Sequence, residues 1–203
     1  GLRPIAVEPS FLAAGRAFAL RARRREDAPV ARAVVEVAST GSNLVVMSGD
    51  RMVFAKVLSI GGMHVDDAVV KRCGVTVEEA RLLRRDACSS TLDETCTRHI
   101  FDAVRRPSEE LANELAMSLR YAAVTARIGN VEAIHTCGEE VAIPGLEAAI
   151  EAACPGVTVG SDPTTDRWLK MIQTAGDGSS REWAVALGLA MRPVKTTARR
   201  RAA

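Results

Sequence analysis

The feature that most constrains this chain is a series of three closely spaced apolar runs between residues 33 and 62. The runs cover residues 33–37, 44–47 and 52–58. They are rich in valine, and small polar segments separate them. Turn signals at such short spacing between β-branched runs predict consecutive hairpins. The stretch therefore predicts a three-stranded β-meander with a turn of small residues after its first strand.

The segment before the meander predicts a short edge strand over residues 1–8, followed by a helix. Ser10 is the predicted N-cap of that helix, because a serine hydroxyl can accept from a backbone N–H of the first turn. Phe11 and Phe18 lie on one face at helical spacing. The arginine-rich residues 21–25 then end the helix, where cations suit the helix dipole.

After the meander the apolar period changes to that of helices. A first helix stops at Gly74, and Thr76 with Glu79 forms a capping box that begins the next helix. A third helical stripe is predicted to end before Pro107, and Ser108 to cap a separate long helix. Two strands and two helices follow, over residues 131–136, 157–159, 146–153 and 183–191.

This order of elements predicts an α/β fold with helices on both faces of a sheet and a mostly helical insertion. Residues 1–62 and 107–192 are predicted to form the core lobe. Residues 63–106 are predicted to form the inserted helical subdomain, and residues 193–203 a basic tail.

Composition excludes several classes of protein. The net charge of +2 is too small to favour nucleic acid as a partner. The five cysteines are odd in number and scattered, which argues against a disulfide framework, and the three histidines show no metal-ligand spacing. Since no apolar run reaches transmembrane length and no signal peptide is present, we expect a cytoplasmic protein.

Five stretches carry a resemblance to a known family. They are residues 5–18, the meander closing on Ile60-Gly61-Gly62, the helix 78–85, the loop and helix at 137–146, and the closing helix 184–192. Taken in this order, they resemble the second half of an actin-like ATPase of the type IV pilus assembly protein PilM group, related to the cell-division protein FtsA. The resemblance covers nearly the whole chain and implies an actin-like, ribonuclease H-like lobe.

The resemblance also implies a nucleotide site. Glu36 would be the catalytic carboxylate of the turn that contacts phosphate in this family. The implied nucleotide-binding residues are Ser39, Thr40, Gly41, Gly61, Gly62, Arg81, Arg84 and Gly138. No metal ligand is predicted among the side chains of the chain itself.

Two of the implied nucleotide loops depart from the family pattern. The phosphate turn usually reads Asp-x-Gly, whereas this chain has a longer carboxylate at Glu36 and a methyl group at Ala38. The adenosine loop is usually three glycines, whereas Gly138 is followed here by Glu139 and Glu140. Two carboxylates there would repel a polyphosphate and remove the close approach that glycine allows. The family's first lobe, with its own phosphate loop, has no match in this chain.

These observations lead to three hypotheses about function. The favoured one is a non-catalytic assembly or scaffold protein of a type IV pilus, a secretion system or a related envelope machine, without a cofactor. The alternative is an ATP-binding switch that uses ATP and Mg²⁺, with this chain as one lobe. A third is a membrane-tethered protein that uses its basic tail.

The expected partners are other proteins of the assembly machine, including inner-membrane components, at the cytoplasmic face of the inner membrane. The sequence leaves open whether the chain forms a homo-oligomer. Cys137 is interpreted as a small residue rather than a reactive thiol, and Trp168 as either a partly buried side chain or a surface anchor for a partner.

Overall fold

The computed structural model describes residues 4, 6–19, 30–89, 91–160, 167 and 180–192. The predictions for residues 21–25, for Trp168 and for the basic tail therefore lie outside the described residues. None of the described helices is long and apolar enough to cross a membrane.

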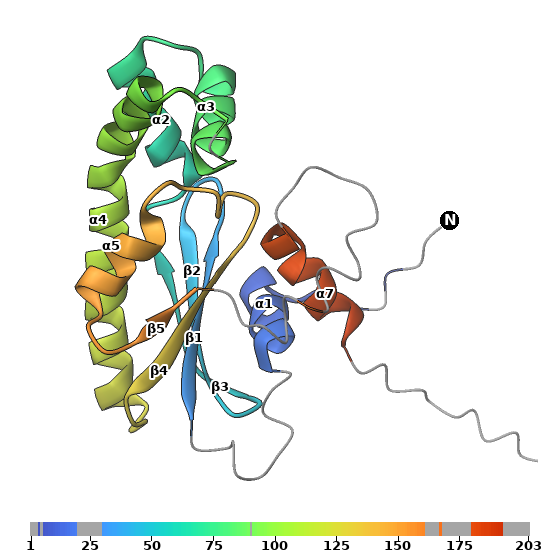
Figure 1. Ribbon diagram of the computed structural model, residues 1–203. Coiled ribbons are helices and arrows are strands. Elements are labelled where there is room, and N and C mark those ends of the chain that lie inside the picture. The colour runs from blue at the N-terminus through green and yellow to red at the C-terminus, as the bar shows by residue number, and fades with distance from the viewer. Residues whose placement is uncertain are drawn as a thin grey trace, which may run out of the picture.

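The described core is a five-stranded sheet with the order β3-β2-β1-β4-β5 (Figure 1). The strands are β1 (Ala31–Val37), β2 (Ser42–Ser48), β3 (Arg51–Leu58), β4 (Val131–Cys137) and β5 (Thr158–Val159). The pairs β1–β2 and β2–β3 are antiparallel, whereas β4 is parallel to both β1 and β5. The predicted meander is confirmed, and it supplies three of the five strands.

Helices α4 (Glu94–Thr125) and α5 (Leu146–Ala153) cover one face of the sheet (Figure 1). The larger hydrophobic core lies here, and fully buried Val35 of β1 packs in it with Leu115 of α4 and Ile150 of α5. Successive strand residues point to opposite faces, so the neighbouring Val34 belongs to a second core on the other face.

Helices α1 (Ser10–Phe18) and α7 (Ala184–Ala190) cover that other face, and the 3-10 helix Ser180–Trp183 leads into α7. Gly188 of α7 lies directly against α1, because a Cβ there would be only 1.7 Å from the carbonyl oxygen of Ala13. Beside this contact, Arg16 donates to both carboxylate oxygens of Glu8, at 2.7 and 2.9 Å.

Helices α2 (Gly62–Cys73) and α3 (Val77–Ser89) lie with the first turns of α4 at one end of the sheet (Figure 1). Gly74 ends α2 with φ +68°, a left-handed conformation that suits glycine. The predicted capping box is confirmed, because the Thr76 N–H donates to Glu79 at 2.9 Å and the Glu79 N–H donates to the Thr76 hydroxyl at 3.3 Å.

The predicted break at Pro107 is wrong. Helix α4 continues through Pro107, and the hydroxyl of Ser108 donates to the Val104 carbonyl at 2.8 Å instead of capping a new helix. Proline inside a helix costs about 3 kcal/mol. Burying Ile100, Val104 and Leu111 on one continuous stripe gains about 1.5–3 kcal/mol for each side chain, which outweighs that cost.

Two predictions for the N-terminal segment are also wrong in its described part, residues 4 and 6–10. Residues 6–9 have no regular secondary structure, and Val7 is 95% exposed, so it buries nothing that would hold a strand in place. Pro9, not Ser10, is the N-cap of α1, and no side chain caps the helix. Ser10 instead donates its hydroxyl hydrogen bond to Glu36 of β1.

Candidate functional site

The turn between β1 and β2 is interlocked with the first turn of α2. The Gly62 N–H donates to the Ala38 carbonyl, and the Met63 N–H donates to the Ser39 carbonyl, both at 2.9 Å. Backbone N–H groups at a helix N-terminus are ready anion donors. Here the turn carbonyls accept from two of these N–H groups, so the protein supplies the partners itself.

Two glycines make that interlocking possible. A Cβ on Gly61 would lie 2.3 Å from the backbone nitrogen of Gly41 and 2.6 Å from the Ala38 carbonyl oxygen. A Cβ on Gly41 would lie 2.8 Å from the carbonyl oxygen of Leu58. The structure therefore brings together the predicted residues of the turn and the start of α2, and backbone contact requires the glycines.

Glu36 lies near the end of β1 and is 7% exposed. Its Oε2 atom accepts from the Ser10 hydroxyl at 2.8 Å and from the Asn43 side-chain amide at 3.0 Å. The predicted catalytic carboxylate thus links α1, β1 and β2. This contact also explains why Ser10 does not cap α1.

Arg81 and Arg84, both on α3, belong to an ion-pair network that is buried except at the half-exposed Arg81. Arg84 is 1% exposed; its Nε donates to Asp66 at 3.1 Å, and its Nη1 donates to the Ala142 carbonyl at 2.8 Å. Its Nη2 pairs with the Glu140 carboxylate, and the Arg81 Nε donates to the second Asp66 oxygen at 2.9 Å. We call Asp66, Arg81, Arg84 and Glu140 the ionic quartet; its formal charges cancel.

Glu140 brings the quartet against the start of α2. A Cβ placed on Gly62 would lie 2.6 Å from Glu140 Cγ and 2.8 Å from its Cδ, so the glutamate side chain packs directly on that glycine. The Glu140 N–H also donates to the Val37 carbonyl at 3.1 Å. A side chain therefore fills the room that a third loop glycine would leave, and the residues present here do not fit a nucleotide well.

Gly138 and Cys137 form the start of the same loop. Gly138 has φ +111°, and a Cβ there would lie 2.4 Å from the Val37 carbonyl oxygen, so the loop passes directly over β1. The Gly138 N–H donates to the Arg181 carbonyl at 3.3 Å. Cys137 is fully buried, and burial raises the pKa of its thiol far above the ordinary range. The interpretation of Cys137 as a small buried residue is confirmed.

Sequence reasoning missed the two acidic members of the quartet. From sequence, Glu139 and Glu140 are treated alike, as carboxylates that would repel a polyphosphate, yet Glu139 is exposed and Glu140 is buried. Asp66 was not singled out at all. The available signal was the pair of arginines three residues apart on α3, which share one helix face and need acidic partners if that face is buried.

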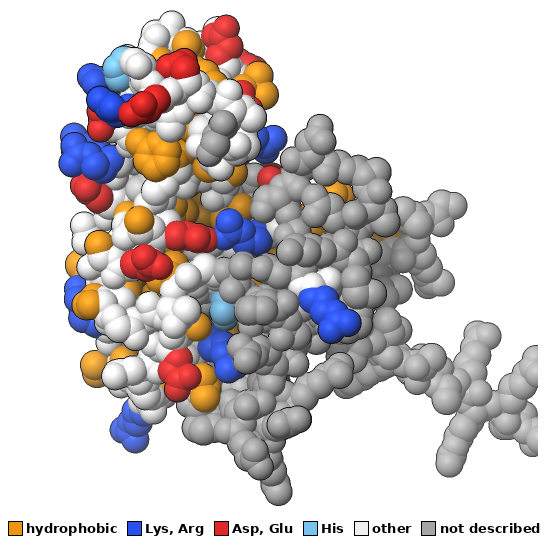
Figure 2. Space-filling model, in the orientation of Figure 1, with side chains coloured by type: hydrophobic (Ala, Val, Ile, Leu, Met, Phe, Trp, Pro, Cys, Tyr) orange, Lys and Arg blue, Asp and Glu red, His pale blue; other side chains and the backbone are white. Residues whose placement is uncertain are grey.

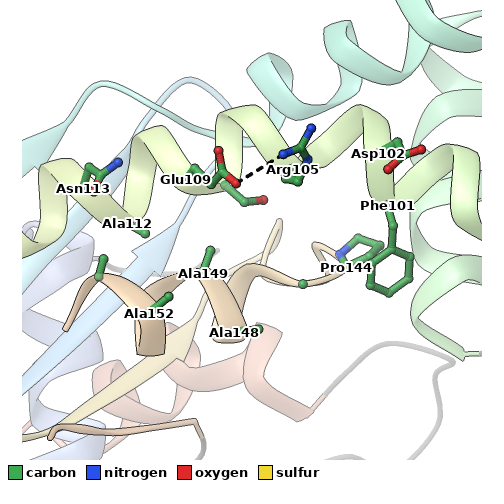
Figure 3. A pocket seen from close by; sticks show the side chains of 13 residues that line it. Phe101, Asp102, Arg105, Glu109, Ala112, Asn113, Pro144, Ala148, Ala149 and Ala152 are labelled. Carbon is green, nitrogen blue, oxygen red and sulfur yellow. Dashed lines mark ion pairs between the residues drawn. The ribbon is translucent and has the colours of Figure 1, made fainter. Parts of the chain in front are cut away.

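Two cavities lie beside the site rather than in it. The larger, about 570 Å³, is a hollow between α4 and α5; Phe101 and Pro144 close one end, and alanines of α5 line it (Figure 3). Arg105 and Glu109 form an ion pair of 3.9 Å on its α4 side (Figure 3). A second, of about 440 Å³, lies between α3 and α5. Neither is lined by any of the nine predicted site residues.

Charge on the visible surface is mixed. On the face shown in Figure 2, basic and acidic side chains of the described residues are interspersed along α4 and α5, with hydrophobic side chains between them. Among the described residues, no group of three or more histidine, cysteine, aspartate or glutamate side chains could hold a metal ion.

The sheet order, the helices on both of its faces and the turn packed on α2 define an actin-like lobe, as the resemblance implied. A family model described as type IV pilus assembly protein PilM matches residues 2–194. The chain belongs to this family.

Solved structures agree with this assignment. The chain is similar to a PilM–PilN type IV pilus biogenesis complex, with a TM-score of 0.71 and 22% identity over 94% of this chain and 53% of the other. It is also similar to the ethanolamine utilization protein EutJ from Carboxydothermus hydrogenoformans, with a TM-score of 0.61 and 15% identity over 89% and 52% of the two chains. The archaeal actin homologue Ta0583 gives a TM-score of 0.56 and 17% identity over 89% and 53%. The chain thus spans about half the length of each of these structures.

Proposed function

We propose that this chain is the second lobe of a non-catalytic, actin-like assembly protein of a type IV pilus or a related envelope machine. The carrying observation is the contact between Glu140 and Gly62, with Arg84 buried behind it. A pair of charges held this way is costly to break, because removing one partner leaves the other buried and uncompensated. A nucleotide entering here would have to separate them.

The second support is the use already made of the phosphate turn. Two N–H groups at the start of α2 donate to turn carbonyls, and Glu36 accepts from Ser10 and Asn43. In the proposal, the carboxylate held by these two donors serves to link the core elements. In this proposal the lobe works through protein contacts and needs no cofactor.

Calorimetry with Mg-ATP tests the proposal, using the protein at its natural length so that both lobes of the fold are represented. We expect no tight, Mg-dependent binding. The matched comparison is the Glu139→Gly, Glu140→Gly double variant, which restores the usual loop. Tight Mg-ATP binding by the unmodified protein would overturn the proposal, whatever the double variant does.

An ATP-binding switch is the alternative, and the retained Gly61, Gly62 and Gly138 favour it. Its discriminating test is nucleotide turnover by the natural-length protein. The switch requires turnover that is lost on Glu36→Ala, whereas turnover unchanged by that substitution contradicts it.

For partners, we propose contacts with other pilus assembly proteins at the cytoplasmic face of the inner membrane. Support comes from the similar PilM structure, which was solved as a complex with PilN. Fractionation of cells tests this. We expect the chain in the membrane fraction when the PilN homologue is present, and in the cytosolic fraction when the gene of that homologue is deleted. An unchanged distribution would contradict it.

A further inference from the structure

Strand β3 is an edge strand that is apolar on both of its faces. In the described part of the chain it pairs with β2 on one side, and no described strand lies on the other. Met52 is 43% exposed and Val57 is 67% exposed, and Ala55 between them is exposed as well. The outer N–H and C=O groups of such a strand are a template for pairing with another chain.

Edge strands are usually protected from pairing by a β-bulge or by a charged side chain, and neither protects the centre of β3. The shift in register with β2 falls next to Val46, at the hairpin end, so residues 54–58 pair regularly. Lys56, the charged residue within this part, folds back onto α4. Its Nζ donates to the Ser118 hydroxyl at 3.0 Å and lies 3.4 Å from a Glu114 carboxylate oxygen.

An apolar stripe of α4 continues this edge. Met117, Tyr121 and Val124 recur at helical spacing and are 57%, 62% and 79% exposed. The Tyr121 ring meets the Phe54 ring of β3 edge to face, with centroids 6.0 Å apart. We call β3 together with these three α4 residues the edge surface. Exposed apolar side chains gathered in this way favour an interaction site.

We propose that two copies of this chain associate through the edge surface, with their β3 strands antiparallel about a two-fold axis at Ala55. An axis perpendicular to the sheet keeps each face on its own side, so facing residues must have the same strand parity. Centring at Ala55 sets Val53 opposite Val57, and Phe54 opposite Lys56 of the second copy, which is a favourable cation–π pair.

The position of Lys56 selects this register of the two β3 strands. The next register that keeps each face on its own side has the two-fold axis at Lys56. It would place two ammonium groups directly opposite each other, which is destabilising. At Ala55 each Lys56 stays paired with Glu114 of its own copy and faces an aromatic ring. The two sheets then form one continuous sheet, and both α4 helices lie on the same side of it, which brings the two stripes toward each other.

Sedimentation velocity of the 203-residue chain tests the association. We expect a concentration-dependent dimer, and at least about a tenfold weaker dimer for Val57→Lys, since a charge on the pairing face opposes burial of that edge. Leu82→Lys is the control, because Leu82 is 61% exposed on α3, away from β3. Circular dichroism verifies that both variants fold. Equal weakening by both variants would contradict the proposal.

A crosslink tests the register itself. Exposed Cys73 and Cys88 are first replaced by serine, and Ala55→Cys or, as control, Met63→Cys is added. Directly opposite residues of antiparallel strands have Cβ atoms about 4.5–5.5 Å apart, so the Ala55→Cys chains reach disulfide distance with a small shift. We expect an oxidised dimer for Ala55→Cys alone.

Two outcomes would overturn this inference. A dimer in sedimentation that fails to crosslink at residue 55 would show that the copies associate elsewhere or in another register. A chain that stays monomeric throughout would leave the edge for a strand of another protein and would show the second copy to be the wrong occupant.

Discussion

The two loops that meet at the start of α2 differ in what holds them. The β1–β2 turn is held by backbone contacts: Gly61 and Gly41 touch with no room for a Cβ, and N–H groups of α2 donate to turn carbonyls. The loop after β4 is held by a side chain, since Glu140 packs on Gly62 and pairs with Arg84. One loop keeps its shape through the backbone, and the other through a buried ion pair.

The difference indicates which of the two loops can accept other side chains without loss of the fold. Backbone contacts strongly favour glycine at Gly61, because the atoms that a Cβ would meet are backbone atoms of the turn at residues 38–41. A loop glycine that only gave space to a ligand can be replaced, provided that the new side chain finds partners. Asp66 and Arg84 are those partners for Glu140.

The largest expected effect comes from breaking the quartet. Arg84→Ala leaves Asp66 and Glu140 buried without their main partner, and a broken buried pair costs about 3–5 kcal/mol. Urea unfolding measures the loss of unfolding free energy. Arg85→Ala is the control, because Arg85 is exposed on the same helix and should change stability by less than about 0.5 kcal/mol. Similar losses for the two variants would show that the quartet stabilises nothing.

The next effect separates the two loops directly. Both Gly61→Ala and Gly62→Ala overpack the site, which costs about 1–3 kcal/mol, with Gly61→Ala at the upper end because its neighbours are backbone atoms. In a Glu140→Gly background the cost of Gly62→Ala should nearly vanish, while that of Gly61→Ala should not change. A double-mutant cycle by urea unfolding gives both values. Equal coupling of both glycines to Glu140 would contradict the comparison.

Substitutions of Glu36 are expected to lower the free energy of unfolding by a smaller amount. Glu36→Ala leaves the Ser10 hydroxyl and the Asn43 amide without their buried acceptor, a loss of about 1–2 kcal/mol. Glu36→Gln keeps one acceptor oxygen and should lose less. Thermal unfolding of the two variants measures this order. If both variants were as stable as the unmodified chain, Glu36 would have no structural role.

The smallest expected effect is on the pH dependence of stability, on the side of the sheet that α1 and α7 cover. The hydrogen bond from Arg16 holds the pKa of Glu8 below its ordinary value, and Arg192 adds to this. A lowered folded-state pKa contributes stability that is present above the unfolded pKa, near 4.5, and is lost as the pH falls through the folded pKa. Glu8→Gln should therefore be less stable than the unmodified chain at neutral pH and equal to it in strong acid. Parallel stability curves across this range would contradict the expectation.

Local patterns predicted most elements of the fold. The meander, the capping box of α3 and the glycine stop of α2 are determined by neighbours in sequence. The failures at Pro107 and Ser10 have a common reason. In each case a distant contact outweighs a local preference: burial of the α4 stripe in one case and the Glu36 carboxylate in the other.

The candidate site was predictable as a set of positions but not as an arrangement. The glycines and the two arginines could be singled out as positions, because glycine spacing and helix spacing are visible in sequence; their role in binding a nucleotide stays a prediction. The partners of the arginines were not, since Asp66 and Glu140 lie 18 and 56 residues from Arg84. Only one of two adjacent glutamates is buried, and nothing in their sequence distinguishes them.

By itself, the sequence determined the strands of the meander, the helix boundaries marked by glycine and by the capping box, and the family, because short-range backbone preferences and motif order carry this information. The tertiary structure decided that α4 is one helix, that Glu36 links α1 to the sheet, and that Glu140 turns inward to Arg84. The reason is physical: the free energy of a buried charge or an interrupted helix depends on what packs against it, and those neighbours come from distant parts of the chain.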